Sequence, residues 1–147
     1  MSSFKWTDCP VIIPYYGGKY QLSKVLVPML PKHERYIEVF AGGLSMYFRK
    51  VNSKLSIVND FDNDIANLYH VICEDFDRFK SYCKMIPKAR HLFYNFRLEL
   101  KDKPEINFPD YRRAVKYYYI IMNAFNNNYH TPMSKEDDWD TNALDFI

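Results

Sequence analysis

Glycine is scarce in this sequence. The 147 residues include only four glycines, and these form two adjacent pairs, at residues 17–18 and 42–43. Glycine lets a backbone turn sharply or come close to a ligand. A chain with so few glycines has placed them where the backbone requires them, so each pair marks a candidate functional turn.

Cysteine is also rare, and long apolar runs are absent. Cys9, Cys73 and Cys83 are odd in number and show no metal-ligand spacing, and the four histidines show none either. We therefore expect no disulfide framework and no metal, and reduced thiols in a cytoplasmic protein. Without a signal peptide or a run of about 18 apolar residues, we expect no membrane partner.

The charge balance excludes little. A net charge of +2 permits nucleic-acid binding without arguing for it, because dedicated DNA-binding domains are often more basic. Apolar residues make up 48% of the chain, with 13 tyrosines and 11 phenylalanines. A disordered chain would be poor in both aromatics. The length and composition therefore predict about one folded domain with a substantial core.

The pattern around the second glycine pair predicts an α/β unit. Residues 36–40 and 55–58 are short, β-branched and aromatic, as strands are, and residues 44–51 between them fit a helix. Strand, glycine turn, helix and strand form a parallel crossover. The other segments have helical periodicity: we expect helices over 21–30, over 62–86, around 92–100, and from Pro109 in its first turn to Phe125.

The second pair also lies at a chemically informative distance from an acid. Asp60 ends the second strand, 18 residues after Gly42. In nucleotide-binding α/β sheets, an acid at about this distance accepts hydrogen bonds from ribose hydroxyls. The competing interpretation is a tight turn with a capping aspartate, and the spacing alone leaves both open.

The first pair follows two aromatic residues and precedes a cation. Tyr15 and Tyr16 could stack on a purine, and Lys19 could pair with a carboxylate. A plain loop leading into the first helix would have the same composition, so this motif by itself decides nothing.

Taken together, the motifs resemble one family. Residues 15–19 (YYGGK), 37–45 (IEVFAGGLS) and 58–62 (VNDFD) are similar in order and spacing to motifs of Dam-like adenine-specific DNA methyltransferases. The resemblance implies that S-adenosylmethionine is the cofactor. Tyr15 would lie against it, Lys19 and the backbone of Phe40, Ala41 and Gly42 would contact its amino-acid end, and Asp60 would hold its ribose.

The resemblance also implies a fold and a division of the chain. We expect the N-terminal part of a Rossmann-like α/β methyltransferase domain, mostly helical here, with a short parallel sheet whose open side exposes apolar residues. Residues 1–72 would form the cofactor-binding half, 73–133 a helical, DNA-facing subdomain, and 134–147 an acidic segment. Double-stranded DNA would be the partner, as in restriction-modification systems.

The family's catalytic motif is missing from the sequence. That motif contains two adjacent prolines, whereas no two of the eight prolines here are adjacent. We therefore expect no catalytic residue in this chain and no methyl transfer by it alone. The catalytic half would follow in a longer parent or lie on another chain.

Two further regions leave the DNA-facing role open. The family's glycines on either side of Phe-Asn are missing around Phe125 and Asn126, where Asn127 and Asn128 follow, and asparagine tolerates left-handed backbone better than most residues, so the turn can survive. The cations of residues 78–116, interleaved with acids, are more typical of a solvated helix face than of a DNA surface. The neighbouring run Tyr117–Tyr119 is more typical of a core.

Three hypotheses remain at this point. The chain is the cofactor-binding part of an adenine methyltransferase, a non-catalytic module that binds the cofactor or DNA, or an unrelated Rossmann-like nucleotide-binding protein. Cofactor binding, and the presence of a catalytic half, would distinguish them.

Overall fold

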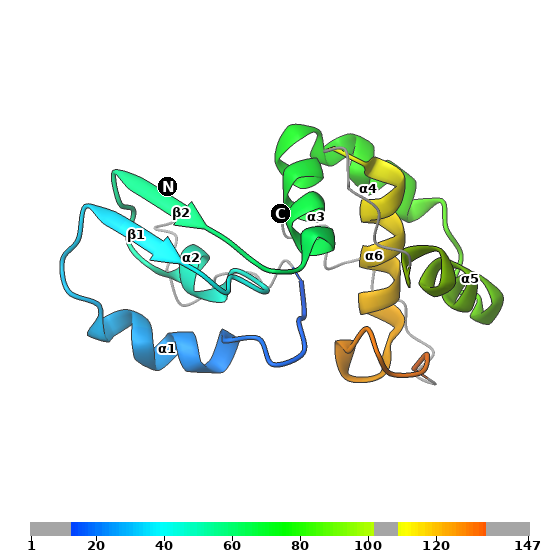
Figure 1. The fold of residues 1–147 in the computed structure, drawn as a ribbon, viewed down its shortest axis with the longest axis horizontal. Coiled ribbons are helices and arrows are strands. Elements are labelled where there is room, and N and C mark those ends of the chain that lie inside the picture. Colours follow the sequence, from blue (N-terminus) through cyan, green and yellow to red (C-terminus); the bar gives the residue numbers. More distant parts are fainter. Residues whose placement is uncertain (1–12, 102–108, 135–147) are drawn as a thin grey trace, which may run out of the picture.

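The computed structural model describes residues 13–101 and 109–134. Most of these residues are helical (Figure 1). The elements in chain order are α1 (Tyr20–Met29), β1 (Arg35–Glu38), α2 (Ser45–Arg49), β2 (Leu55–Val58), α3 (Asn63–Glu74), α4 (Phe76–Lys84), α5 (Arg90–Lys101), α6 (Tyr111–Asn123) and the 3-10 turn η2 (Phe125–Asn127).

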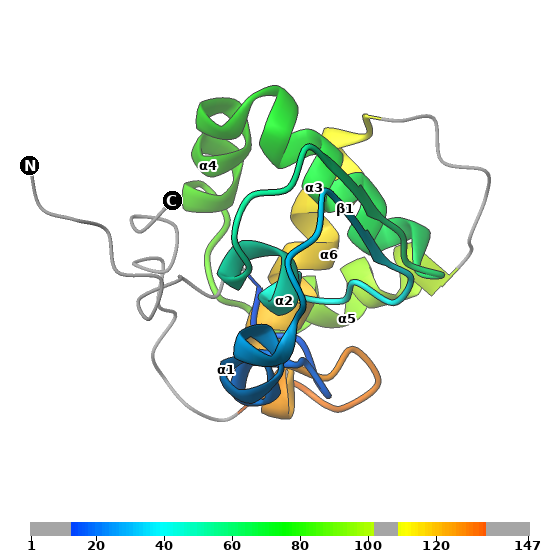
Figure 2. The ribbon, with the colours of Figure 1, turned by 90° about the vertical axis from the view of Figure 1, so that its left-hand side faces the viewer.

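The sheet of the described residues consists of β1 and β2, which pair in parallel with Ile37 opposite Ile57. This confirms the predicted parallel crossover. Helix α2 lies between α1 and the strands in both views (Figures 1 and 2). Side chains alternate across a strand, so Glu38 is buried at 6% exposure while its neighbour Ile37 is 65% exposed.

The uncovered face of the sheet is apolar. Ile57 is 48% exposed and Leu55 is 49% exposed, and both point to the same side as Ile37 because paired residues share a face. This confirms the expected exposure of apolar side chains on the open side. Each of the two strands also has an outer edge that no described strand pairs with, and an apolar edge of this kind is prone to pair with further chain.

The core lies among the helices. Helix α6 packs against α3, α4 and α5, and Figure 1 shows it between α3 and α5. Tyr117, Tyr118 and Tyr119 are each at most 2% exposed. The interpretation of this tyrosine run as core is therefore confirmed. The largest fully buried side chains are Ile13, Ile65, Leu68, Val71, Phe79, Phe93, Leu100, Tyr117, Tyr119, Ile120 and Ile121.

One predicted helix is in fact two. We expected a continuous helix over 62–86, but Asp75 leaves the helical conformation with φ −153° and ψ 86°. Its carboxylate accepts a hydrogen bond from the N–H of Arg78 at 3.0 Å and begins α4 as a cap. The apolar periodicity missed the break because both helices bury residues at helical spacing, whereas a capping aspartate interrupts only the backbone.

Other element ends also differ from the expectation. Pro109 is not in the first turn of α6, because Asp110 caps that helix by accepting from the N–H of Arg113 at 2.9 Å. Leu44 is not helical either: it precedes α2 with φ 53°. The first strand ends at Glu38 rather than at residue 40.

The end of α6 follows the expectation for asparagine. The helix stops at Asn123, so Phe125 belongs to η2 instead. Asn126 and Asn127 have φ of 53° and 52°, in the left-handed region that asparagine tolerates. The acidic segment from residue 135 lies outside the described residues, and the division at residue 72 stays a prediction.

Candidate functional site

The two turns that follow the strands are joined by one carboxylate. Asp60 Oδ2 accepts a hydrogen bond from the N–H of Gly42 at 2.7 Å, and Asp60 Oδ1 accepts from the N–H of Asp62 at 3.0 Å. Gly42 has φ +49°, where a side chain would be strained. Because parallel strands end at the same edge of the sheet, the 18-residue spacing brings this acid onto the glycine turn.

The first glycine pair packs against the second. A Cβ on Gly42 would lie 3.4 Å from Cδ1 of Tyr15, so the tyrosine ring lies beside the Gly42 turn. A Cβ on Gly18 would come within 2.7 Å of the Tyr15 carbonyl oxygen, which accepts the N–H of Gly18 at 2.8 Å. Gly18 is therefore required by a tight turn, and the two motifs form one cluster.

Lys19 anchors this cluster from the start of α1. Its ammonium donates to the carbonyl of Phe40 and lies 3.0 Å from Glu38 Oε1. The other carboxylate oxygen of Glu38 accepts from the hydroxyl of Tyr36 at 3.0 Å. Burial, and then the charge of Glu38, raise the pKa of Tyr36. Lys19 keeps 31% of its side chain exposed, so its ammonium reaches solvent.

All six residues predicted to hold the cofactor therefore lie together. Tyr15 touches Gly42, Lys19 binds the carbonyl of Phe40, and Asp60 closes the turn, as described above. The remaining residue, Ala41, is buried and donates its N–H to the carbonyl of Asn59 at 2.9 Å. The structure thus brings the predicted site together, while the role of each residue stays a prediction.

Sequence reasoning missed one exposed aromatic beside this cluster. Phe61 directly follows Asp60 and is 92% exposed, and Phe40 is 72% exposed. Large apolar side chains this open offer flat surfaces for stacking. An aromatic residue immediately after the acid that ends a strand is a signal that could have identified Phe61.

A cavity of about 180 Å³ adjoins Tyr15. It lies between the first loop, the start of α3, the middle of α6 and the segment after η2. The residues around it are Tyr15, Tyr16, Asp62, Asp64, Tyr117, Ile121, Asn127, Asn128, Tyr129 and His130.

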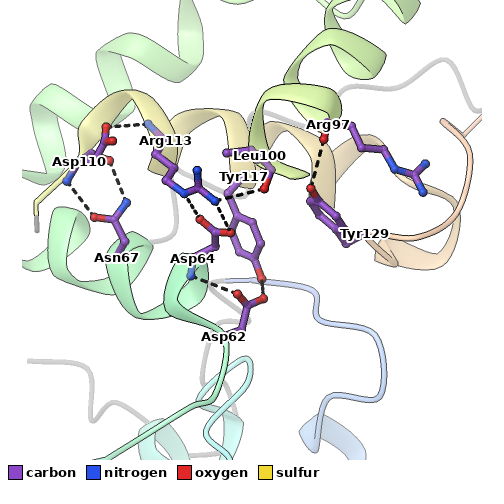
Figure 3. Close-up of polar contacts among 9 residues, drawn as sticks. All are labelled: Asp62, Asp64, Asn67, Arg97, Leu100, Asp110, Arg113, Tyr117 and Tyr129. Carbon is purple, nitrogen blue, oxygen red and sulfur yellow. Dashed lines mark hydrogen bonds and ion pairs between the residues drawn. The ribbon is translucent and has the colours of Figure 1, made fainter. Parts of the chain in front are cut away.

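Polar contacts lock α3 to α6 beside this cavity (Figure 3). Arg113 donates to both carboxylate oxygens of Asp64, at 2.5 and 3.0 Å, and both side chains are buried. Asn67 and the backbone of Asp110 exchange two hydrogen bonds of 2.8 Å. Arg113 was expected on a solvated face; instead it is 8% exposed, because Asp64 gives it a buried partner.

Two tyrosines in this region have raised pKa values. The hydroxyl of Tyr117 donates to Asp62 Oδ2 at 2.9 Å, as Figure 3 shows. Burial, followed by the charge of Asp62, raises its pKa. Burial and then the charges of Asp62 and Asp60 raise the pKa of Tyr15 as well. Both hydroxyls therefore stay protonated at neutral pH.

Other cations of the helical part have partners within the chain. Arg97 donates to the carbonyls of Thr131 and His130 at 2.8 and 2.6 Å, and Lys116 pairs with Glu99. In the described part of the chain, no three His, Cys, Asp or Glu side chains are placed to hold a metal ion. None of the described helices is long and apolar enough to cross a bilayer.

Comparison with known proteins identifies the family. Residues 15–137 match the model of the D12 class N6 adenine-specific DNA methyltransferases. The matched span contains the whole cluster around Gly42 and Asp60. Since it covers more than half of the chain, the match establishes membership.

Individual relatives agree with this match. The chain is 26% identical over 118 residues to the DNA adenine methylase of Escherichia coli K12, covering 78% of this chain and 41% of that protein. It is 29% identical over 117 residues to the retron Ec67 DNA adenine methylase of Escherichia coli, covering 78% and 40%. The type II methyltransferase M.MjaIII of Methanocaldococcus jannaschii is 26% identical over 125 residues, covering 79% and 38%. The chain thus spans about two fifths of the length of these relatives.

Proposed function

Because the chain belongs to the D12 class N6 adenine-specific DNA methyltransferase family, we propose that it is the S-adenosylmethionine-binding half of such an enzyme. The complete enzyme would methylate the exocyclic amine of adenine in double-stranded DNA. One observation carries the proposal: Asp60 closes the glycine turn at the edge of the sheet, with Tyr15 packed against the same turn.

The residues fit the adenosine part of this cofactor. An ionised carboxylate has about four acceptor positions, and the two backbone N–H groups of Gly42 and Asp62 occupy one on each oxygen of Asp60. Positions remain for ribose hydroxyls. The exposed ring of Phe61 follows this carboxylate in the chain, and the exposed ring of Phe40 precedes the glycine turn that the carboxylate closes; both supply faces on which adenine could stack.

The amino-acid end of the cofactor would meet Lys19. An ammonium group has three N–H donors; one of them is donated to the carbonyl of Phe40, and Glu38 lies beside the same ammonium as an ion pair at 3.0 Å. A donor remains for the cofactor carboxylate. When bound, S-adenosylmethionine supplies a methyl group on a sulfonium, which is electrophilic. The chain's own part is to hold and orient that donor.

The catalytic half must come from elsewhere. The target amine is a weak nucleophile, and enzymes acting on it flip the base into a dedicated pocket. The adjacent-proline motif expected in that pocket is absent from the 147 residues. We infer that it lies in a longer parent or on a second chain, that its strands extend the sheet by pairing with the outer edges of β1 and β2, and that its packing covers the exposed side chains of Ile37 and Ile57.

Family membership removes one of the three initial hypotheses, the unrelated nucleotide-binding protein. A non-catalytic module of the same family remains as the alternative. A role in restriction and modification is in keeping with the type II name of one relative. The experiment that distinguishes the two is complementation: a catalytic half is added to the chain, and adenine methylation is measured.

Calorimetry with S-adenosylhomocysteine tests the cofactor site. A charge-assisted hydrogen bond is worth about 1.5–3 kcal/mol, so Asp60→Ala should weaken binding about tenfold or more, and Lys19→Ala should do likewise. Glu34→Ala is the matched control, because Glu34 precedes β1 and its exposed ion pair with Lys54 lies at the other end of the strands. Equal affinity in wild type and both site variants would reject the assignment.

Methyl transfer tests the rest of the proposal. Positioning of the reacting groups supplies about 7–11 kcal/mol of a barrier, and binding the cofactor alone does not replace it. The isolated chain should therefore transfer no labelled methyl group to duplex DNA. A catalytic half from a family member, fused or added in trans, should restore adenine methylation. Multiple turnover by the isolated chain would refute the assignment of catalysis to the missing half.

A further inference from the structure

Tyr117 reaches from the helical core to the edge of the cofactor site. It lies on α6, is 2% exposed, and donates its hydroxyl to Asp62 Oδ2 at 2.9 Å across 55 residues of sequence. A buried hydroxyl that gave up this bond would be costly to leave unpaired. The contact therefore fixes where Asp62 lies relative to α6 (Figure 3).

Asp62 passes this constraint to the cofactor turns through its backbone. Its N–H donates to Asp60 Oδ1 at 3.0 Å, and Asp60 Oδ2 accepts from Gly42 at 2.7 Å. Its own Oδ1 accepts from the N–H of Asp64 at 3.1 Å and begins α3. A continuous set of hydrogen bonds thus runs from Tyr117 to the glycine turn.

The starting point of this set is itself rigid. The buried pair of Arg113 and Asp64 and the double hydrogen bond of Asn67 and Asp110 hold α6 against α3. The hydroxyl of Tyr117 therefore has one position relative to the start of α3. Substitutions along such coupled networks typically change binding at a distant site by about 0.5–2 kcal/mol.

We propose that Tyr117 is a positioning residue for the cofactor: its hydroxyl, through Asp62, orients the carboxylate of Asp60 for the ribose hydroxyls. This inference rests on the proposed cofactor site. It gives the helical part of the chain a task in cofactor binding, beyond any role in contacting DNA.

The test compares two tyrosines of the same helix. Tyr117→Phe removes only the hydroxyl in question. Tyr119→Phe is the matched control, because the Tyr119 side chain is as little exposed as that of Tyr117, whereas its hydroxyl accepts from the N–H of Ala89 at 2.8 Å and donates to the Pro87 carbonyl, in the segment before α5. Stability is measured by urea unfolding, and affinity for S-adenosylhomocysteine by calorimetry well below the unfolding temperature.

We expect both variants to lose similar stability, and only Tyr117→Phe to lose affinity, by about three- to tenfold. In an Asp60→Ala background, Tyr117→Phe should cause no further loss, since the carboxylate that it orients is gone. Equal affinity of the two variants, or an undiminished loss in that background, would overturn the positioning role and leave the cofactor site intact. A wild-type chain that does not bind S-adenosylhomocysteine would overturn both.

Discussion

Removal of the carboxylate of Asp64 should cost the fold a large share of its stability. Asp64 and Arg113 retain only 4% and 9% of their side-chain exposure, and two N–H groups of the guanidinium meet the carboxylate. Asp64→Ala would remove the carboxylate that faces this buried cation, and the hydrogen bond to the carbonyl of Leu100 at 3.2 Å brings no opposite charge in its place. Breaking one side of such a pair costs about 3–5 kcal/mol, against about 5–15 kcal/mol of stability for a whole domain.

Urea unfolding of three variants measures this cost. Asp64→Ala should lower the free energy of unfolding by about 3–5 kcal/mol. Glu99→Ala removes the carboxylate of another ion pair, between Glu99 of α5 and Lys116 of α6, in which both side chains are more exposed. That change should cost less than about 1 kcal/mol, because water already solvates both charges.

A double variant separates the loss of the pair from the burial of a lone charge. Arg113→Met in the Asp64→Ala background removes the unpaired cation and should restore part of the lost stability, since replacing a whole buried pair is often close to neutral. Two results would contradict this account of the buried ion pair between α3 and α6. One is that Asp64→Ala lowers the free energy of unfolding no more than Glu99→Ala does. The other is that the double variant is less stable than Asp64→Ala alone.

Two further predictions concern thiols and alkaline pH. Cys73 is exposed, whereas burial raises the pKa of Cys83 to about 12. A maleimide at pH 7 should therefore modify Cys73 in the folded chain and Cys83 only after denaturation, which peptide mass spectrometry would detect. Rapid labelling of Cys83 in the folded chain would contradict its burial. Burial raises the pKa of Tyr69 and Tyr117 above the ordinary value of 10.0. As the pH rises above 10, the unfolded chain therefore loses the protons of these two hydroxyls before the folded chain does. Their contribution to the stability of the fold is complete below pH 10 and is lost above it. Tyr117→Phe should make this alkaline loss, followed by urea unfolding between pH 8 and 11, less steep, and an unchanged slope would count against the raised pKa.

The sequence by itself determined the local turns and their meaning. Gly42 and Asp60 follow two short strands, and the geometry of a parallel crossover requires the ends of such strands to meet at one edge. The left-handed turn at Asn126 was predictable for the same reason, since it depends on which residues tolerate a positive φ. These features depend on residue type and spacing within one stretch of chain.

Only the tertiary structure decided what the long-range polar residues do. Nothing local distinguishes Arg113 from the exposed cations around it, because its partner Asp64 lies 49 residues away and the two meet only when α6 packs on α3. Tyr117 likewise has the composition of an ordinary core tyrosine, and its bond to Asp62 spans 55 residues. The break at Asp75 also escaped the periodicity, which reports the buried face of a helix and not the continuity of its backbone. Burial and pairing across such distances are properties of the packed chain, since they depend on which helix faces which.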